Sequence, residues 1–191
     1  MRVRCRALLA AFVLLAGCSS LPPGALPGRD QVGDFALEAR FALRVTLPDS
    51  APQSAGGRLS WEHKNDANRI LIANPLGIAL AEIETTPALS RLQTADGKRL
   101  ESPDADALME EVTGQRLPVT RLPAWLLGRP GPNAAVSIDP LGRPSHLQEG
   151  EWRIDYDYED FAPSALPSRL TLNRNQEIEL RLRIEEWKEA P

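Results

Sequence analysis

The residue best placed for covalent chemistry is Cys18, because its thiol lies at the end of an N-terminal export signal. Three arginines within the first six residues form a basic n-region. Residues 7–16 form an apolar run that is too short to span a bilayer as a stable helix. We therefore expect residues 1–17 to be a signal peptide, and its cleavage to leave Cys18 as the mature N-terminus.

The four residues Leu15-Ala16-Gly17-Cys18 resemble the bacterial lipobox. In that motif the cysteine receives a diacylglyceryl thioether and an N-acyl chain, which the resemblance implies for Cys18. An ordinary signal peptide with an incidental cysteine is the alternative, but all four positions fit the motif. Ser19 stands where an aspartate would retain an enteric lipoprotein in the inner membrane, so the resemblance predicts a lipid anchor in the outer membrane.

Other side chains that could act as nucleophiles or metal ligands are few. The histidines are His63 and His146, and the second cysteine, Cys5, leaves with the signal. The sequence contains no Gly-x-Ser-x-Gly elbow and no phosphate loop. Alternate carboxylates on a half-exposed strand are more typical of a solvated face than of a glycosidase pair; those in question are Asp155, Asp157, Glu159 and Asp160. We therefore expect neither catalysis, nor a cofactor, nor a metal site.

The composition fits one exported domain held to a membrane by lipid. Removal of residues 1–17 from the 191-residue chain leaves 174 residues, and because it removes three arginines and no acid, the net charge falls from −4 to −7. Such a surface disfavours nucleic acid. Residues 18–33 are rich in proline and glycine and predict a tether that could reach about 45 Å from the bilayer. Residues 34–191 then form a single domain, which we expect to be monomeric and to face the periplasm.

Most of this domain alternates between apolar and polar residues, which predicts β-strands. The longest example covers residues 35–47, where every odd position is apolar. Turn residues separate the segments at the spacing of antiparallel hairpins. The other predicted strands cover residues 57–63, 69–73, 78–84, 88–94, 98–101, 135–138, 145–148, 152–158, 168–172 and 177–187.

Two helices interrupt the strands. The first is predicted between Ser102 as N-cap, with Pro103 at the first helical position, and Gly114. The second covers residues 121–127. The chain is therefore predicted to be an α+β protein of about eleven antiparallel strands, with the helices lying on one face of a curved sheet.

Such a sheet, covered only by a short helical insert, can leave a gap lined by apolar side chains. A ligand with acyl chains would fit that gap. The alternative is a dry core in which helices and sheet simply pack together, and that is the default for an unknown sheet protein. The composition does not decide between the two.

The segment Asn74-Pro75-Leu76-Gly77 has the residue preferences of a type I turn, which places Leu76 near its tip. Large apolar residues are unusual at that position. In one interpretation Leu76 folds back or is a harmless exposed leucine, since singly exposed apolar residues are common. In the other, Leu76 together with Ile78 enters lipid or contacts an acyl chain. From the residues alone, the first interpretation is favoured.

Taken together, these segments resemble the LolB family of outer-membrane lipoproteins, which accept other lipoproteins from the periplasmic carrier LolA. The resemblance covers the whole mature domain and rests on the order and spacing of several short motifs. They are Trp61 and His63, residues 74–77, 96–97, 106–107, 113–114, 125–131, 152–158, 166–167 and 184–187.

The resemblance implies an unclosed antiparallel barrel with a helical lid over a hydrophobic cavity. It also implies that the loop of Pro75, Leu76 and Gly77 delivers cargo to the membrane, which reverses the preference stated above. The implied partners are LolA, acylated lipoprotein cargo and outer-membrane lipid. The residues expected to border the cavity are Phe41, Leu43, Trp61, Ile70 and Trp152 from the sheet, with Leu108, Val112 and Trp125 from the lid.

Two features depart from the family pattern. The tether is richer in proline than expected, and Arg129 stands where an apolar residue is familiar. Neither changes the implied role. The alternative function is that of a lipocalin-like envelope lipoprotein, which would bind free lipids or another apolar small molecule.

Overall fold

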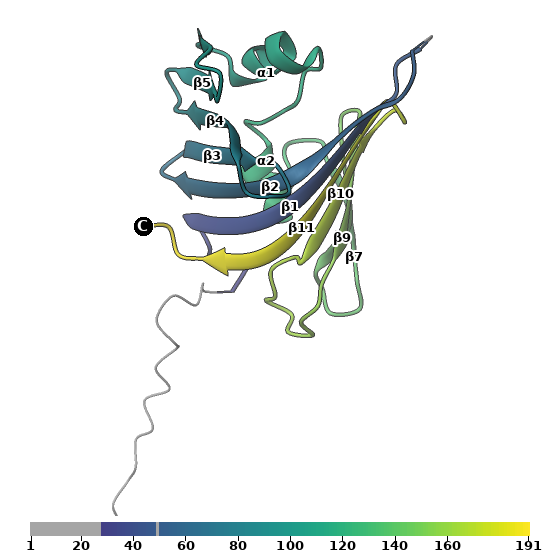
Figure 1. Ribbon diagram of the computed structural model, residues 1–191. Coiled ribbons are helices and arrows are strands. Elements are labelled where there is room, and N and C mark those ends of the chain that lie inside the picture. The colour runs from purple at the N-terminus through teal and green to yellow at the C-terminus, as the bar shows by residue number, and fades with distance from the viewer. Residues whose placement is uncertain (1–27, 49) are drawn as a thin grey trace, which may run out of the picture.

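The strands form one antiparallel sheet that curves into an open half-barrel (Figure 1). The computed structural model describes residues 28–48 and 50–191, so the predicted signal peptide, Cys18 and the first part of the tether lie outside the described residues. The strands are β1 (Phe35–Val45), β2 (Gln53–Lys64), β3 (Ala67–Ala73), β4 (Ala79–Thr85), β5 (Ser90–Thr94), β6 (Arg99–Ser102), β7 (Ala135–Ile138), β8 (Pro144–Glu149), β9 (Trp152–Asp157), β10 (Arg169–Arg174) and β11 (Ile178–Lys188).

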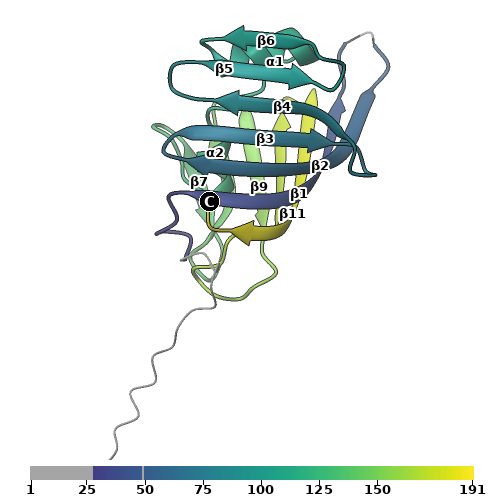
Figure 2. The same cartoon turned by 60° about the vertical axis from the view of Figure 1, so that its left-hand side comes forward.

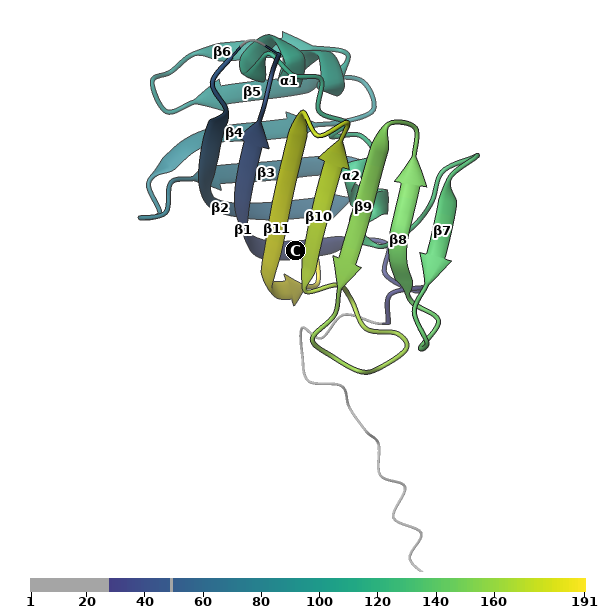
Figure 3. The same ribbon diagram turned by 90° about the vertical axis from the view of Figure 1, so that its right-hand side faces the viewer.

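The order of the strands places the first strand beside the last. It runs β6-β5-β4-β3-β2-β1-β11-β10-β9-β8-β7, so that β1 and β11 pair in the middle of the sheet while β6 and β7 form its edges. Figure 2 shows β2 to β6 in front of the steeply crossing strands β9 to β11, and Figure 3 shows β7 to β11 from the other side. The predicted unclosed antiparallel barrel of eleven strands is confirmed.

The concave face is apolar because alternate residues of every long strand point toward it. Phe41 on β1 lies opposite Leu182 on β11. On the other half of the sheet, Trp61 lies opposite Ile70, which in turn lies opposite Ile83. The odd-numbered residues of β1 therefore face inward, which settles a parity that the sequence left open.

Two short helices lie inside the curve of the sheet: α1 (Ala105–Thr113), which contacts β5 and β6, and α2 (Leu122–Leu126) (Figure 1). The N-cap of α1 is Asp104, whose carboxylate accepts hydrogen bonds from the backbone N–H groups of Asp106 and Ala107. The prediction of Ser102 as N-cap was wrong, because Ser102 belongs to β6 and its hydroxyl accepts from the backbone of Asp104. In the described part of the chain, neither helix has the length and apolar character needed to cross a membrane.

Residues 28–33, which the sequence assigns to the tether, pack against the sheet domain. The N–H of Arg29 donates to the carbonyl oxygen of Ser164 at 2.9 Å, and Val32 is buried in the core. Arg129 donates to the backbone carbonyls of Arg29, at 3.2 Å, and of Val32. The arginine that departs from the family pattern therefore fastens the start of the domain.

Gly57 allows β2 and β3 to approach closely. A Cβ at this position would lie 2.1 Å from the carbonyl oxygen of Ala73 and 3.1 Å from the ring of Phe41. We expect Gly57→Ala to lower the free energy of unfolding by about 1–2 kcal/mol, because backbone cannot move aside as a side chain can. Chemical denaturation measures this loss. Gly33→Ala is the control, since its Cβ would meet no atom within 4 Å, and an equal loss in both variants would contradict the explanation.

Candidate functional site

An apolar cavity of about 160 Å³ lies between the concave face of the sheet and the helical segment. Five of the predicted residues line it, all from the sheet. The exposed surface of its walls is entirely apolar, which suits hydrocarbon and excludes ordered water. These five residues are Phe41, Leu43, Trp61, Ile70 and Trp152.

Two of the predicted lid residues lie elsewhere. Leu108 and Trp125 are almost completely buried in the core and do not line the cavity. Val112 belongs to α1. The lid contributes instead through Met109 in the middle of α1, Thr113 at its end, and the connection between the helices. That connection has no periodic pattern by which the sequence could reveal it. The residues that sequence reasoning missed are Leu59, Ile72, Ile83, Met109, Thr113, Leu117, Pro118, Val119, Leu122, Leu172, Leu180 and Leu182.

Helix α2 is fixed to the β8–β9 hairpin by the carboxylate of Glu149. Arg121 donates to its two oxygens at 2.7 and 2.9 Å, while the indole of Trp125 and the backbone N–H of Gly131 donate to Oε2 at 3.0 and 2.8 Å. Burial raises the pKa of this carboxyl group, but the hydrogen bonds from Arg121, Trp125 and Gly131 outweigh it and hold the pKa below its usual value. One end of the lid is therefore firmly attached.

The connection between α1 and α2 is held to the opposite wall by Arg174, at the end of β10. Its guanidinium donates to Oε1 of Gln115 at 2.8 Å and to the carbonyl oxygen of Arg116 at 3.3 Å. The same group lies 5.7 Å from the ring centroid of Trp152, which lines the cavity. We call Arg174 and its two hydrogen-bond partners, Gln115 and Arg116, the clasp.

The loop between β3 and β4 displays Leu76 in a fixed conformation. The N–H of Gly77 donates to the carbonyl of Asn74 at 2.9 Å, and Gly77 adopts a φ of 88°, which favours glycine. The side chain of Asn74 accepts from the N–H groups of Leu76 at 2.9 Å and of Ile78 at 3.0 Å. Leu76 is 87% exposed and Ile78 is 61% exposed, so the apolar tip points into solvent rather than under the sheet.

This loop lies at the rim of the cavity. Pro75, Gly57 and Phe41 line a shallow groove on the surface, and Phe41 also lines the cavity itself. Phe41 is therefore shared by the groove at the base of the loop and the apolar cavity.

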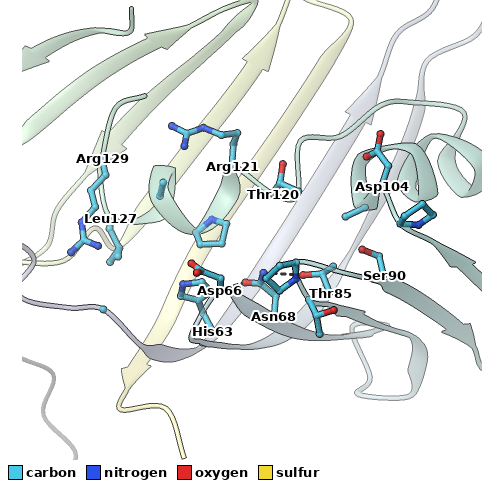
Figure 4. A pocket seen from close by; sticks show the side chains of 17 residues that line it. His63, Asp66, Asn68, Thr85, Ser90, Asp104, Thr120, Arg121, Leu127 and Arg129 are labelled. Carbon is cyan, nitrogen blue, oxygen red and sulfur yellow. Dashed lines mark hydrogen bonds between the residues drawn. The ribbon is translucent and has the colours of Figure 1, made fainter. Parts of the chain in front are cut away.

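A larger pocket of about 700 Å³ lies between the β2–β3 turn, the β4–β5 turn and the helices (Figure 4). Asn68 organises one wall: its side-chain oxygen accepts from the indole of Trp61 at 3.0 Å and lies 2.9 Å from Nδ1 of His63, while its amide donates to Thr85 at 2.9 Å. Arg121 lies across the pocket (Figure 4). The walls of this pocket mix polar and apolar groups, so despite its greater volume it suits acyl chains less well than the wholly apolar cavity.

His63 lines the larger pocket, whereas His146 and the four acidic residues considered for catalysis lie outside both pockets. Nδ1 of His146 lies 2.5 Å from Oδ1 of Asp155, and this pair is on the convex side of β8 and β9, where Asp157 is also exposed. Across residues 28–48 and 50–191, no cluster of three histidine, cysteine or acidic side chains is arranged to hold a metal ion.

Comparison with known proteins identifies the family. The family described as "Outer membrane lipoprotein LolB" matches residues 33–187. The outer-membrane lipoprotein LolB of Dechloromonas aromatica is 64% identical, over 96% of this chain and 97% of its own length. The proteins of that name from Azoarcus, at 32% identity over 93% and 91%, and from Bordetella petrii, at 34% over 85% and 84%, are similar over most of their lengths. The chain therefore belongs to the LolB family of outer-membrane lipoproteins.

Proposed function

We propose that this protein accepts lipoproteins from the periplasmic carrier LolA and transfers their acyl chains to the outer membrane. The observation that carries the proposal is the junction at Phe41, where an apolar cavity meets a loop that displays an exposed leucine. The cavity supplies a place for hydrocarbon, and the loop supplies a contact with lipid. In this proposal Cys18 carries the protein's own acyl anchor.

The size of the hydrophobic effect explains why a protein is needed for this step. A triacylated cysteine carries on the order of 45 methylenes, whose exposure to water would cost roughly 36 kcal/mol. Free diffusion across the periplasm is therefore excluded. Cargo must pass from one apolar cavity to another through joined openings, and no ATP is required if each acceptor binds it more tightly than the last.

The cavity has to enlarge before it can hold such a cargo. An apolar cavity of about 150 Å³ accommodates one benzene molecule, and the cavity here measures about 160 Å³. We infer that the connection between α1 and α2 moves outward when cargo enters. Glu149 fixes α2 at one side, so the clasp at Arg174 is the contact that must open.

Replacing Arg174 with alanine is expected to speed the receipt of cargo from LolA. Loss of two hydrogen bonds, at about 0.5–1.5 kcal/mol each, would favour the open lid by roughly 5–150-fold. This factor is the upper limit for the increase in the rate of cargo receipt. Stopped-flow fluorescence with a labelled lipoprotein measures the rate. Arg169→Ala, at an exposed position on the same strand, is the control, and an unchanged or slower rate in Arg174→Ala would contradict the role of the clasp.

The transfer reaction itself tests the proposed function. A purified LolA–lipoprotein complex is mixed with this protein, first without and then with liposomes. Cargo is expected to move to this protein in the first reaction and to the liposomes in the second. A binder of free lipids would instead retain a small ligand in native mass spectrometry and would take no lipoprotein from LolA, and that result would overturn the proposal.

A further inference from the structure

A second exposed apolar surface lies at the other end of the sheet from the helix α1, near the point where the described chain begins. Its members are Ile138 at the end of β7, Leu141 in the β7–β8 turn and Phe161 in the β9–β10 loop. They are 68%, 38% and 86% exposed. Figure 3 shows the two loops reaching down side by side. We call these three residues the lower patch.

Hydrogen bonds hold the lower patch together. Arg143, only 7% exposed, pairs with Asp139 at 2.7 Å and donates to the carbonyl oxygen of Asp160 at 2.6 Å. Its guanidinium also lies 4.1 Å from the ring centroid of Tyr158. Arg143 thereby joins the β7–β8 turn, which carries Leu141, to the β9–β10 loop, which carries Phe161.

The loop that carries Phe161 is itself ordered. The side chain of Asp160 accepts from the N–H of Ala162 at 3.0 Å, and the N–H of Ala165 donates to the carbonyl of Ala162 at 3.0 Å. Ala165 is buried. Phe161 is thus held in solvent by a defined backbone. Together with Ile138 and Leu141 it forms a grouped apolar exposure of the kind that marks a contact surface.

The course of the chain indicates what this surface contacts. Ser164, in the same loop, accepts the hydrogen bond from Arg29, so the segment that leads to the lipid anchor leaves the domain beside Phe161. Gly28 lies ten positions after Cys18, and a fully extended chain spans at most about 35 Å over ten steps. An anchor at Cys18 would therefore keep the lower patch within this distance of the bilayer.

The charges near the patch favour a neutral lipid surface. Glu159 and Asp160 are exposed beside Phe161. Of the cations at this end of the domain, Arg143 is buried and paired with Asp139, and Arg29 is paired with Asp30 and only 13% exposed. Attraction to anionic headgroups is therefore not available, and the contact relies on apolar burial. We propose that Ile138, Leu141 and Phe161 rest on the zwitterionic phospholipid surface in which the protein's own anchor is embedded. This contact is separate from the proposed delivery by Leu76 and does not require cargo.

A polarity-sensitive fluorophore tests the contact in the intact lipoprotein. With Cys18 acylated, Phe161→Cys provides the single thiol for an NBD label, and Gln93→Cys on β5 provides a label at an exposed control position. In phosphatidylethanolamine–phosphatidylcholine vesicles, the label at position 161 is expected to show blue-shifted emission and quenching by brominated lipid. The label at position 93 is expected to show neither, and Ile138→Glu is expected to reduce both signals at position 161.

Other occupants give different results. Equal emission at positions 161 and 93 would overturn the proposal, as would a shift at position 161 that appears only when LolA is added. Lipoprotein delivery measured on the same samples separates the two hypotheses. Normal delivery with a silent label overturns the lower patch alone, whereas a shifted label without delivery overturns the proposed function alone.

Discussion

Replacing Leu76 with glutamate is expected to slow delivery of lipoprotein into liposomes by about 10–100-fold, because burying a leucine in hydrocarbon contributes roughly 1.5–3 kcal/mol. The side chain is 87% exposed and its loop is held by Asn74, so folding should be unaffected. Receipt of cargo from LolA should also remain, since Leu76 does not line the cavity. The measurement follows a labelled lipoprotein from LolA to this protein and then to liposomes.

A matched substitution separates the position of Leu76 from the general effect of a new charge. Leu47→Glu changes a leucine that is 37% exposed, in the connection between β1 and β2. Delivery by this variant should equal that of the unaltered protein. If Leu76→Glu also delivers normally, the loop has no part in membrane contact and the proposed role of Leu76 is wrong.

Replacing Glu149 with glutamine is expected to lower the free energy of unfolding by about 2–3 kcal/mol, because one charged and two neutral donor groups around a largely buried carboxylate lose their charged acceptor. Arg121 would then face the amide that replaces one carboxylate oxygen, and the hydrogen bonds from Trp125 and Gly131 would weaken. Urea denaturation measures the loss. Glu151→Gln, an exposed change in the same hairpin, is the control.

The pH dependence of stability provides a second measurement on Glu149. Its pKa is lowered in the folded protein, so the unfolded state binds its proton more readily. The stabilisation is therefore complete above the unfolded value of about 4.3 and is lost as the pH falls through the folded value. The destabilisation caused by Glu149→Gln should accordingly be full at pH 7 and should shrink in acid. A constant difference between the two proteins would contradict this account.

The sheet could be predicted from the sequence because its period-two pattern is nearly continuous. The alternation along β1 indicated a strand with one apolar face, and the structure shows the same alternation in its burial. The same alternation could also have identified Leu180 and Leu182 as cavity residues, since both lie on the apolar side of β11. What the pattern could not give was the face that points inward, because a strand has the same period whichever side is buried.

The lid could not be predicted because its important contacts are irregular. Leu117, Pro118 and Val119 line the cavity from a connection without helical or strand period. The clasp joins Arg174 to Gln115 over a separation of 59 residues, and a single sequence carries no signal for such a pair. Leu108, which was expected to border the cavity, lies in the core instead.

The open edges of the sheet carry a risk that the fold limits by their length. An unpaired strand edge offers free N–H and C=O groups to neighbouring chains, and anchoring concentrates copies of a protein on one membrane surface. Here the two edge strands, β6 and β7, have only four residues each, whereas β1 and β11 at the centre have eleven. Helix α1 also contacts β6. The open barrel thus exposes few unpaired backbone groups at its edges, which limits edge-to-edge aggregation.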